Sequence, residues 1–251
     1  MKTSKQLLSL ACSIVLSASA LAQTTATWTG GGGDSDWNNN NNWDIGVPAE
    51  GTNAVVPVAS TVDYSTPMAA TSFNLLGSLG VLNVNAGGFV VGAAGDGAIG
   101  FYGSPAKLFI NSGGAVTLAS GGLTLSNAAG LNVAGGGSLS VAGNLLLGRN
   151  GTGNTGFATN SGGTVSAAAT SVNPNNNSST SLLVIKGGSN DLGNVVVKRS
   201  SAGSGGFSAL GTEGLTISNG LVRMTGFDVG GSDGNYFLTA FMADGVVTNT
   251  G

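Results

Sequence analysis

The acidic residues are the first candidates for chemistry in this chain, because it has no histidine and its single cysteine, Cys12, lies near the N-terminus. Without histidine, a Ser-His-Asp triad and a histidine-ligated metal site are excluded. Glycoside hydrolysis would need two carboxylates about 5 to 9.5 Å apart. The 251 residues include only eleven acidic ones, and none lies between Asp96 and Asp191. The central stretch therefore cannot carry a carboxylate pair.

A group of charged residues near the C-terminus remains a candidate for catalysis. Asp228, Asp233 and Asp244 lie within about twenty residues of Arg223 in the sequence. An acidic cluster beside an arginine is what a polysaccharide lyase needs, with the arginine as the proton acceptor. We interpret these residues first as solvated loop positions. The alternative is a lyase-like or hydrolase-like site in the loops of residues 213–244.

All three tryptophans of the chain, Trp28, Trp37 and Trp43, lie in one short segment near the predicted mature N-terminus. Such rings can stack on a sugar or on a partner protein, and they are therefore candidate ligand-binding residues. They can also cover the apolar end of a repetitive core, which would otherwise be open to edge pairing. We favour the capping role and keep ligand stacking as the alternative.

The segment between these tryptophans contains Asp34-x-Asp36-x-Asn38, which resembles the start of a calcium-binding loop. Asn39 stands where that loop requires glycine, and Ile45 stands where it requires the closing glutamate. An EF-hand is therefore excluded, and we predict no metal site and no cofactor.

The rest of the chain repeats itself. Apolar pairs separated by one residue recur every seven or eight positions, with glycine, serine, asparagine or alanine between them. The pairs are Leu108/Ile110, Val116/Leu118, Leu123/Leu125, Leu131/Val133, Leu139/Val141 and Leu145/Leu147. A longer template, apolar-x-(Val, Ile or Thr)-x-x-Gly-Gly, starts at Leu82, Leu108, Leu131 and Phe157, and a copy one residue shorter starts at Leu183. Periods of this length are typical of solenoids.

The alternation indicates half-buried strands, and the glycine-rich corners allow each strand to end in a sharp bend. The Asn-Gly and Asp-Gly turns of a hairpin array are scarce. We therefore predict an all-β, right-handed parallel β-helix with about three short strands per coil of 23–26 residues. Asparagines at the bends should stack into side-chain ladders. The asparagines for which we predict this are Asn111, Asn127, Asn132 and Asn160.

The N-terminal 22 residues differ from the repeats. Lys2 and Lys5 precede an apolar stretch at residues 7–16, and Ala20-Leu21-Ala22 is a small-x-small cleavage signal. Residues 1–22 therefore predict a Sec signal peptide and export, and lipidation at Cys12 is the less favoured alternative. No later stretch is long and apolar enough to predict a membrane span. Residues 23–60 are predicted to form the tryptophan-rich cap and first strands, and residues 61–251 the coils, truncated in mid-pattern.

Four features of the chain together resemble autotransporter-passenger-like β-helix proteins. They are the opening Trp28-Thr29-Gly30, the Asn42-Trp43 pair, the Leu-x-Val-x-x-Gly-Gly coils and the segment at residues 143–153. Such exported proteins are abundant in Verrucomicrobia and Planctomycetes and often end in a PEP-CTERM-type sorting signal. The resemblance implies a β-helix at the cell surface or outside it, with an adhesive or matrix role. The sequence does not contain the translocator barrel or the C-terminal signal of that family, and we therefore expect it to be a fragment of a longer protein.

The expected function is thus a secreted or cell-surface structural, adhesive solenoid without catalytic activity. Its expected partners are extracellular polysaccharide or neighbouring cell-surface proteins. Nucleic acid is not expected, because a net charge of -3 and eight basic residues leave no basic stripe. The alternative is a carbohydrate-binding or polysaccharide-degrading β-helix.

Overall fold

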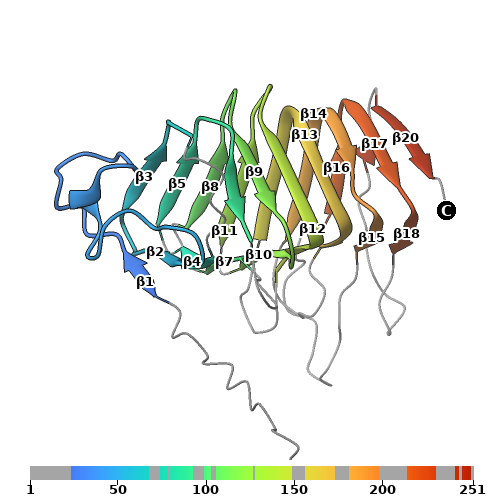
Figure 1. The fold of residues 1–251 in the computed structure, drawn as a ribbon. Coiled ribbons are helices and arrows are strands. Elements are labelled where there is room, and N and C mark those ends of the chain that lie inside the picture. The colour runs from blue at the N-terminus through green and yellow to red at the C-terminus, as the bar shows by residue number, and fades with distance from the viewer. Residues whose placement is uncertain are drawn as a thin grey trace, which may run out of the picture.

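The computed structural model describes residues 24–67, 74–78, 80–92, 99–102, 106–126, 128–148, 156–172, 181–197, 214–229, 241–242 and 245–249. In these residues the chain forms short strands joined by bends, with a single 3-10 turn, η1 (Asn40–Asn42). The pairings between named strands are parallel. The predicted all-β parallel β-helix is confirmed, and Figure 1 shows its coils following one another from the N-terminal to the C-terminal end.

The strands stack in three ladders, in which each strand pairs with the equivalent strand of the next coil. The first ladder contains β3 (Thr61–Tyr64), β5 (Val81–Val84), β8 (Lys107–Ile110), β11 (Ala129–Val133), β13 (Gly156–Val172), β14 (Leu182–Asp191), β16 (Gly214–Ile217) and β19 (Phe241–Met242). The second contains β6 (Phe89–Val91), β9 (Ala115–Leu118), β12 (Ser138–Leu147), further parts of β13 and β14, β17 (Gly220–Met224) and β20 (Gly245–Asn249). The third contains β1 (Thr25–Thr27), β2 (Asn53–Val56), β4 (Asn74–Ser78), β7 (Ile99–Tyr102), β10 (Leu123–Ser126), the ends of β12 and β13, β15 (Asn194–Val197) and β18 (Gly226–Val229).

Three strands are longer than predicted, because they continue around the corners of the coil. The strand β13 is 17 residues long and takes part in all three ladders. It turns the corner at a bulge between Ser161 and Thr164. The corner requires glycine, since a Cβ on Gly163 would lie 2.5 Å from the carbonyl oxygen of Gly137 in the preceding coil. Adjacent coils thus pack backbone against backbone at this bend.

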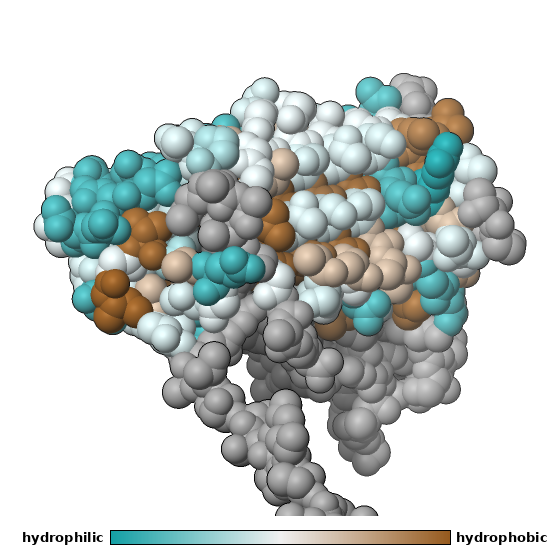
Figure 2. Space-filling model, viewed as in Figure 1, coloured by the Kyte–Doolittle hydropathy of each residue, from teal (hydrophilic) through white to brown (hydrophobic). Residues whose placement is uncertain are grey.

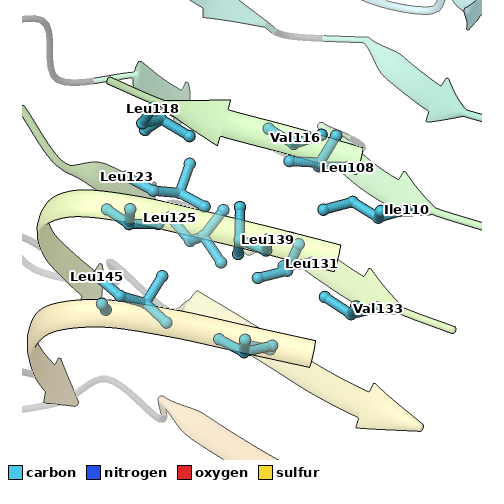
Figure 3. Close-up of a cluster of buried hydrophobic side chains, with 14 of the residues drawn as sticks. Leu108, Ile110, Val116, Leu118, Leu123, Leu125, Leu131, Val133, Leu139 and Leu145 are labelled. Atoms are coloured by element: carbon cyan, nitrogen blue, oxygen red, sulfur yellow. The ribbon is translucent and has the colours of Figure 1, made fainter. Parts of the chain in front are cut away.

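The core consists of the alternate side chains that point into the coil. Figure 3 shows leucine, isoleucine and valine side chains from β8 to β12 pointing into the space between the strands. The apolar residues of all six predicted pairs are buried. Full burial of such a side chain contributes roughly 1.5 to 3 kcal/mol. Apolar side chains of successive coils therefore stack on one another along each inward row, and their burial supplies the main stabilisation.

The template start at Phe157 is wrong by one residue. In the register, Leu131 pairs with Ala158 and Gly130 pairs with Phe157. Ala158 is therefore the inward residue and is 2% exposed, whereas Phe157 points outward and is 39% exposed. A shift of one residue in a strand moves every side chain to the opposite face. The periodicity of the sequence found the coil but misplaced its inward position.

The coils also vary more in length than the predicted 23–26 residues. The register of the first ladder links Val62, Leu82, Leu108, Leu131, Ala158, Leu183 and Leu215 in successive coils, in steps of 20, 26, 23, 27, 25 and 32 residues. The predicted length thus fits the central coils to within one residue. The first and last steps differ because the connections, and not the paired strands, change in length.

The predicted asparagine ladders occur at one of the three positions that the structure describes. Asn111 Nδ2 donates to Asn85 Oδ1 of the preceding coil at 2.7 Å, and Asn85 Nδ2 donates to Ser65 Oγ at 3.0 Å. Asn132 does not fit the prediction, because its row neighbours are Phe109 and Thr159. Asn127 lies outside the described residues. A ladder requires hydrogen-bonding side chains at equivalent positions, and the row of Asn132 does not supply them.

Asn160 lies inside the core instead, in the row that holds Val133 before it and Ile185 after it. Its Nδ2 donates at 2.7 Å to Asn190 Oδ1, which lies on the second ladder of the next coil. Its Oδ1 accepts from the backbone N–H groups of Gly162 and Gly163 at 3.1 and 2.8 Å. Both asparagines are buried. The pair therefore supplies hydrogen-bond partners to the backbone N–H groups of Gly162 and Gly163, at the corner where β13 bends.

Replacing Asn160 with alanine should lower the free energy of unfolding by at least about 3 kcal/mol, since each buried polar group that loses its partner costs about 1 to 3 kcal/mol. Urea unfolding followed by circular dichroism measures the change. Asn132→Ala is the matched control, because Asn132 Oδ1 is buried without a hydrogen-bond partner in the described part of the chain. Equal losses in the two variants would contradict the role assigned to Asn160.

Candidate functional site

The three candidate tryptophans lie inside the N-terminal end of the solenoid. Trp37 is 0% exposed, and Trp28 and Trp43 are also buried. The rings of Trp37 and Trp43 meet edge to face, with centroids 4.7 Å apart, and Trp28 meets Trp43 at 5.2 Å in the same way. Trp37 also packs edge to face on Phe89, at 5.3 Å. The rings cover the end of the core, and in this arrangement no ring face is presented to a ligand.

The backbone of the same segment covers the edges of the first strands. Trp37 N–H donates to the carbonyl oxygen of Asp63 at 3.0 Å, so residues 35–37 extend the first ladder beyond β3. On the other side of the segment, Trp28 and Trp43 form an antiparallel bridge beside β1. Covering an edge in this way prevents its pairing with another chain. We name residues 28–47 the cap.

Replacing Trp37 with alanine should lower the free energy of unfolding by about 3 to 5 kcal/mol, the usual cost of removing a large buried aromatic side chain. Ile45→Ala is the control, because Ile45 is an exposed apolar residue of the same cap. Its effect should stay within about 0.5 kcal/mol. Urea unfolding measures both changes, and a Trp37 variant as stable as the control would show that the ring does not support the core.

Asp34 organises the surface of the cap. Its Oδ2 accepts from Asn39 Nδ2 at 2.9 Å, and its Oδ1 accepts from Asn42 Nδ2 at 2.6 Å and from the backbone N–H of Asp36 at 3.0 Å. These hydrogen bonds, the one from Asn39 first, hold the pKa of Asp34 below its ordinary value of 3.8. In Figure 2 the hydrophilic surface gathers at this end of the molecule. The carboxylate thus has a structural role in the cap.

Lowering the pH should destabilise the cap, and part of this loss of stability should depend on Asp34. Because the folded pKa lies below the unfolded value, the contribution of Asp34 is complete above about pH 3.8 and is lost as the pH falls through the folded pKa. Thermal unfolding monitored by tryptophan fluorescence between pH 5 and pH 2 should show a smaller decrease in Tm for Asp34→Asn than for the wild type. The control variant is Glu50→Gln, which changes an exposed carboxylate outside the hydrogen bonds of Asp34. Parallel curves for Asp34→Asn and the wild type would contradict this assignment.

The predicted catalytic group is not assembled by the described residues. Arg223 lies on β17, where it pairs with Asp191 of the preceding coil. Asp228 lies on β18, beyond the corner at Thr225, and pairs with Val196. Asp233 and Asp244 lie outside the described residues. The corner thus places Arg223 and Asp228 on different ladders, and the acidic neighbour of Arg223 in the register is Asp191.

The outer side of the second ladder carries a set of aligned hydroxyl groups. The register places Ser138, Thr164 and Ser189 in one row, and Thr117, Ser140 and Ser166 in a second row. We name these six residues the hydroxyl face. Four of them are exposed and two, Ser138 and Ser166, are half-buried. The inward residues between them, such as Leu139 and Val165, are buried and fix the outward direction of the rows.

The spacing of these hydroxyls follows from the sheet. Successive coils lie about 4.7 to 4.9 Å apart, and the two rows are separated by about 6.6 to 6.8 Å along each strand. Within the described residues, none of the six side chains hydrogen-bonds to another protein group. The face thus offers regularly spaced donors and acceptors without net charge.

Toward the C-terminus, apolar and charged side chains replace most of the hydroxyls in the same two rows. The first row continues from Ser189 to Leu221 and Val246, and the second continues from Ser166 to Asp191, Arg223 and Thr248. Leu221 is 36% exposed and Val246 is 62% exposed. Figure 2 shows brown and teal surface side by side at this end of the molecule. The rows therefore end in charged and apolar side chains.

Sequence reasoning did not identify the hydroxyl face. The alternation that located the buried residues also marks every intervening residue as outward, and Thr117 and Ser140 are such residues. The signal was present in the positions between the apolar pairs. Their alignment into rows, however, depends on the number of residues in each corner, which the periodicity does not determine.

Comparison with known proteins found no match among protein families, curated proteins or solved structures. Among the described residues no helix is long and apolar enough to span a membrane. In that same part of the chain, no three acidic or cysteine side chains converge to hold a metal ion. The function must therefore be argued from the geometry of the faces.

Proposed function

We propose that this protein is an exported structural and adhesive β-solenoid without catalytic activity, whose hydroxyl face binds extracellular polysaccharide. The observation that carries this proposal is the double row of aligned hydroxyls that have no protein partner in the described residues. Polysaccharides present hydroxyl groups at regular intervals, and each can donate and accept hydrogen bonds with serine and threonine. The runner-up, a polysaccharide-degrading enzyme, has no comparable support.

The strength of such binding would come from repetition. A single neutral hydrogen bond contributes only about 0.5 to 1.5 kcal/mol, because it replaces hydrogen bonds to water. Contacts on several coils at once are joined through one rigid body, so the later ones form at a high effective concentration. The parallel stacking also holds the rows in place before binding, which reduces the entropic cost of association. A solenoid is thus suited to holding a long polymer.

The location that we propose is the outside of the cell. The positively charged start of the chain, the apolar stretch at residues 7–16 and the Ala20-Leu21-Ala22 signal support export. The resemblance to autotransporter-passenger-like β-helix proteins supports placement at the cell surface or in the surrounding matrix. An uncharged binding face also suits neutral polysaccharide better than a nucleic acid, which would require basic side chains.

Co-sedimentation with insoluble cellulose, chitin and calcium alginate tests the proposal. The wild type should sediment with at least one neutral polysaccharide. The variant Ser140→Ala/Thr164→Ala/Ser166→Ala should bind at least about tenfold more weakly, because it loses three hydroxyls that contribute about 0.5 to 1.5 kcal/mol each.

The control variant removes the same number of hydroxyls from other faces: Thr61→Ala/Thr159→Ala/Ser171→Ala. Thr61 and Thr159 point outward from the first ladder, and Ser171 points outward from the third. This variant should bind as the wild type does. Wild-type protein that sediments with none of the polysaccharides, or equal weakening in both variants, would contradict the proposal.

A further inference from the structure

The C-terminal continuation of the hydroxyl rows places charged and apolar side chains next to each other on the outer surface. Asp191 and Arg223 are partners in the register of β14 and β17, and both are exposed. Despite their adjacency, no ion pair or hydrogen bond joins these two side chains, or links either to another group, in the described part of the chain. Both therefore remain free for a ligand.

The apolar side chains Leu221 and Val246 lie in the neighbouring row, which continues from Ser189. Leu221 is two residues before Arg223 on β17, so both point outward from the same strand, and Val246 is the register partner of Leu221 on β20. Together the four residues form a small platform in which a carboxylate and a guanidinium stand beside two exposed aliphatic groups. We name Asp191, Leu221, Arg223 and Val246 the terminal subsite.

We propose that the terminal subsite binds consecutive sugar units of a neutral, extended polysaccharide. A pyranose ring has one side of C–H groups, which can pack on Leu221 and Val246, and an edge of hydroxyls. A carboxylate accepts hydrogen bonds from such hydroxyls and a guanidinium donates to them, and these charge-assisted bonds are about twice as strong as neutral ones. The subsite therefore offers the strongest individual contacts on this side of the solenoid.

The charges select the type of sugar. Asp191 and Arg223 carry opposite charges one coil apart, so they balance for a neutral ligand. An acidic sugar placed on Arg223 would bring its carboxylate close to Asp191 and lose by repulsion what it gains by attraction. Because the whole chain carries a net charge of -3, no longer-range field favours an anion. The expected ligand class is thus a neutral glycan.

The rows also set the direction of the polymer. Asp191 and Arg223 continue the row of Thr117, Ser140 and Ser166, which runs along the solenoid axis. The step between coils, about 4.7 to 4.9 Å, is close to the advance of one ring in an extended β-1,4-linked chain. One sugar can therefore face each coil. This inference rests on the proposed function, because it uses the same rows.

Isothermal titration calorimetry of the full chain with cellohexaose tests the subsite. Asp191→Asn and Arg223→Gln should each weaken binding about tenfold, the usual result of losing a hydrogen bond to a charged group. The charge-matched controls are Glu50→Gln in an exposed turn and Lys107→Gln on the outer side of the first ladder, and both should bind as the wild type does. Thermal unfolding of each variant establishes that the fold is retained.

The outcomes separate the subsite from the proposed function. If wild-type protein binds cellohexaose and the two subsite variants bind equally well, the subsite is overturned and the hydroxyl face stands. If the wild type binds no neutral glycan, the proposed function fails and the subsite fails with it. A polymer along the axis also requires cellohexaose to bind more tightly than cellobiose, and equal affinity for the two would overturn the axial direction.

Discussion

Parallel stacking in register is the constraint on which the rest of this structure depends. Each strand pairs with the equivalent strand of the next coil, so a residue at one position lies directly above its counterpart. The inward rows are therefore mostly apolar, and the outward rows can repeat one chemical group. The contrast between buried Ala158 and exposed Phe157 shows that the pairing register, and not hydrophobicity alone, decides which residue enters the core.

Several special features exist because this stacking has ends and irregular corners. The cap closes the N-terminal end with buried tryptophans and pairs its backbone with the first strands. The pair of Asn160 and Asn190 supplies hydrogen bonds where a corner interrupts the ladder of apolar side chains. The first feature uses aromatic side chains, and the second uses buried polar ones. The coils between Asp96 and Asp191 contain no acidic side chain, and their outer rows can present hydroxyls.

The sequence predicted the fold because alternation and glycine corners are local signals, and pairs such as Leu108 and Ile110 are buried as expected. It also predicted the capping role of the tryptophans, since large rings near the start of a solenoid have an open end to cover. It could not place Phe157 or Asn160, because bulges at the corners shift the register without changing the apparent period. For the same reason it grouped Arg223 with Asp228, although a corner separates them and the register brings Arg223 beside Asp191.

The central claim is that the outward rows are held in line, one coil apart, and disulfide trapping tests it most directly. In a Cys12→Ser background, cysteines replacing Ser140 and Ser166 should oxidise to an intramolecular disulfide, because register partners on adjacent strands lie within the usual Cα separation of about 4.4 to 6.8 Å. Cysteines replacing Ser140 and Val165 should not, since Val165 points into the core. Equal trapping of both pairs, or trapping of the second pair alone, would contradict the account.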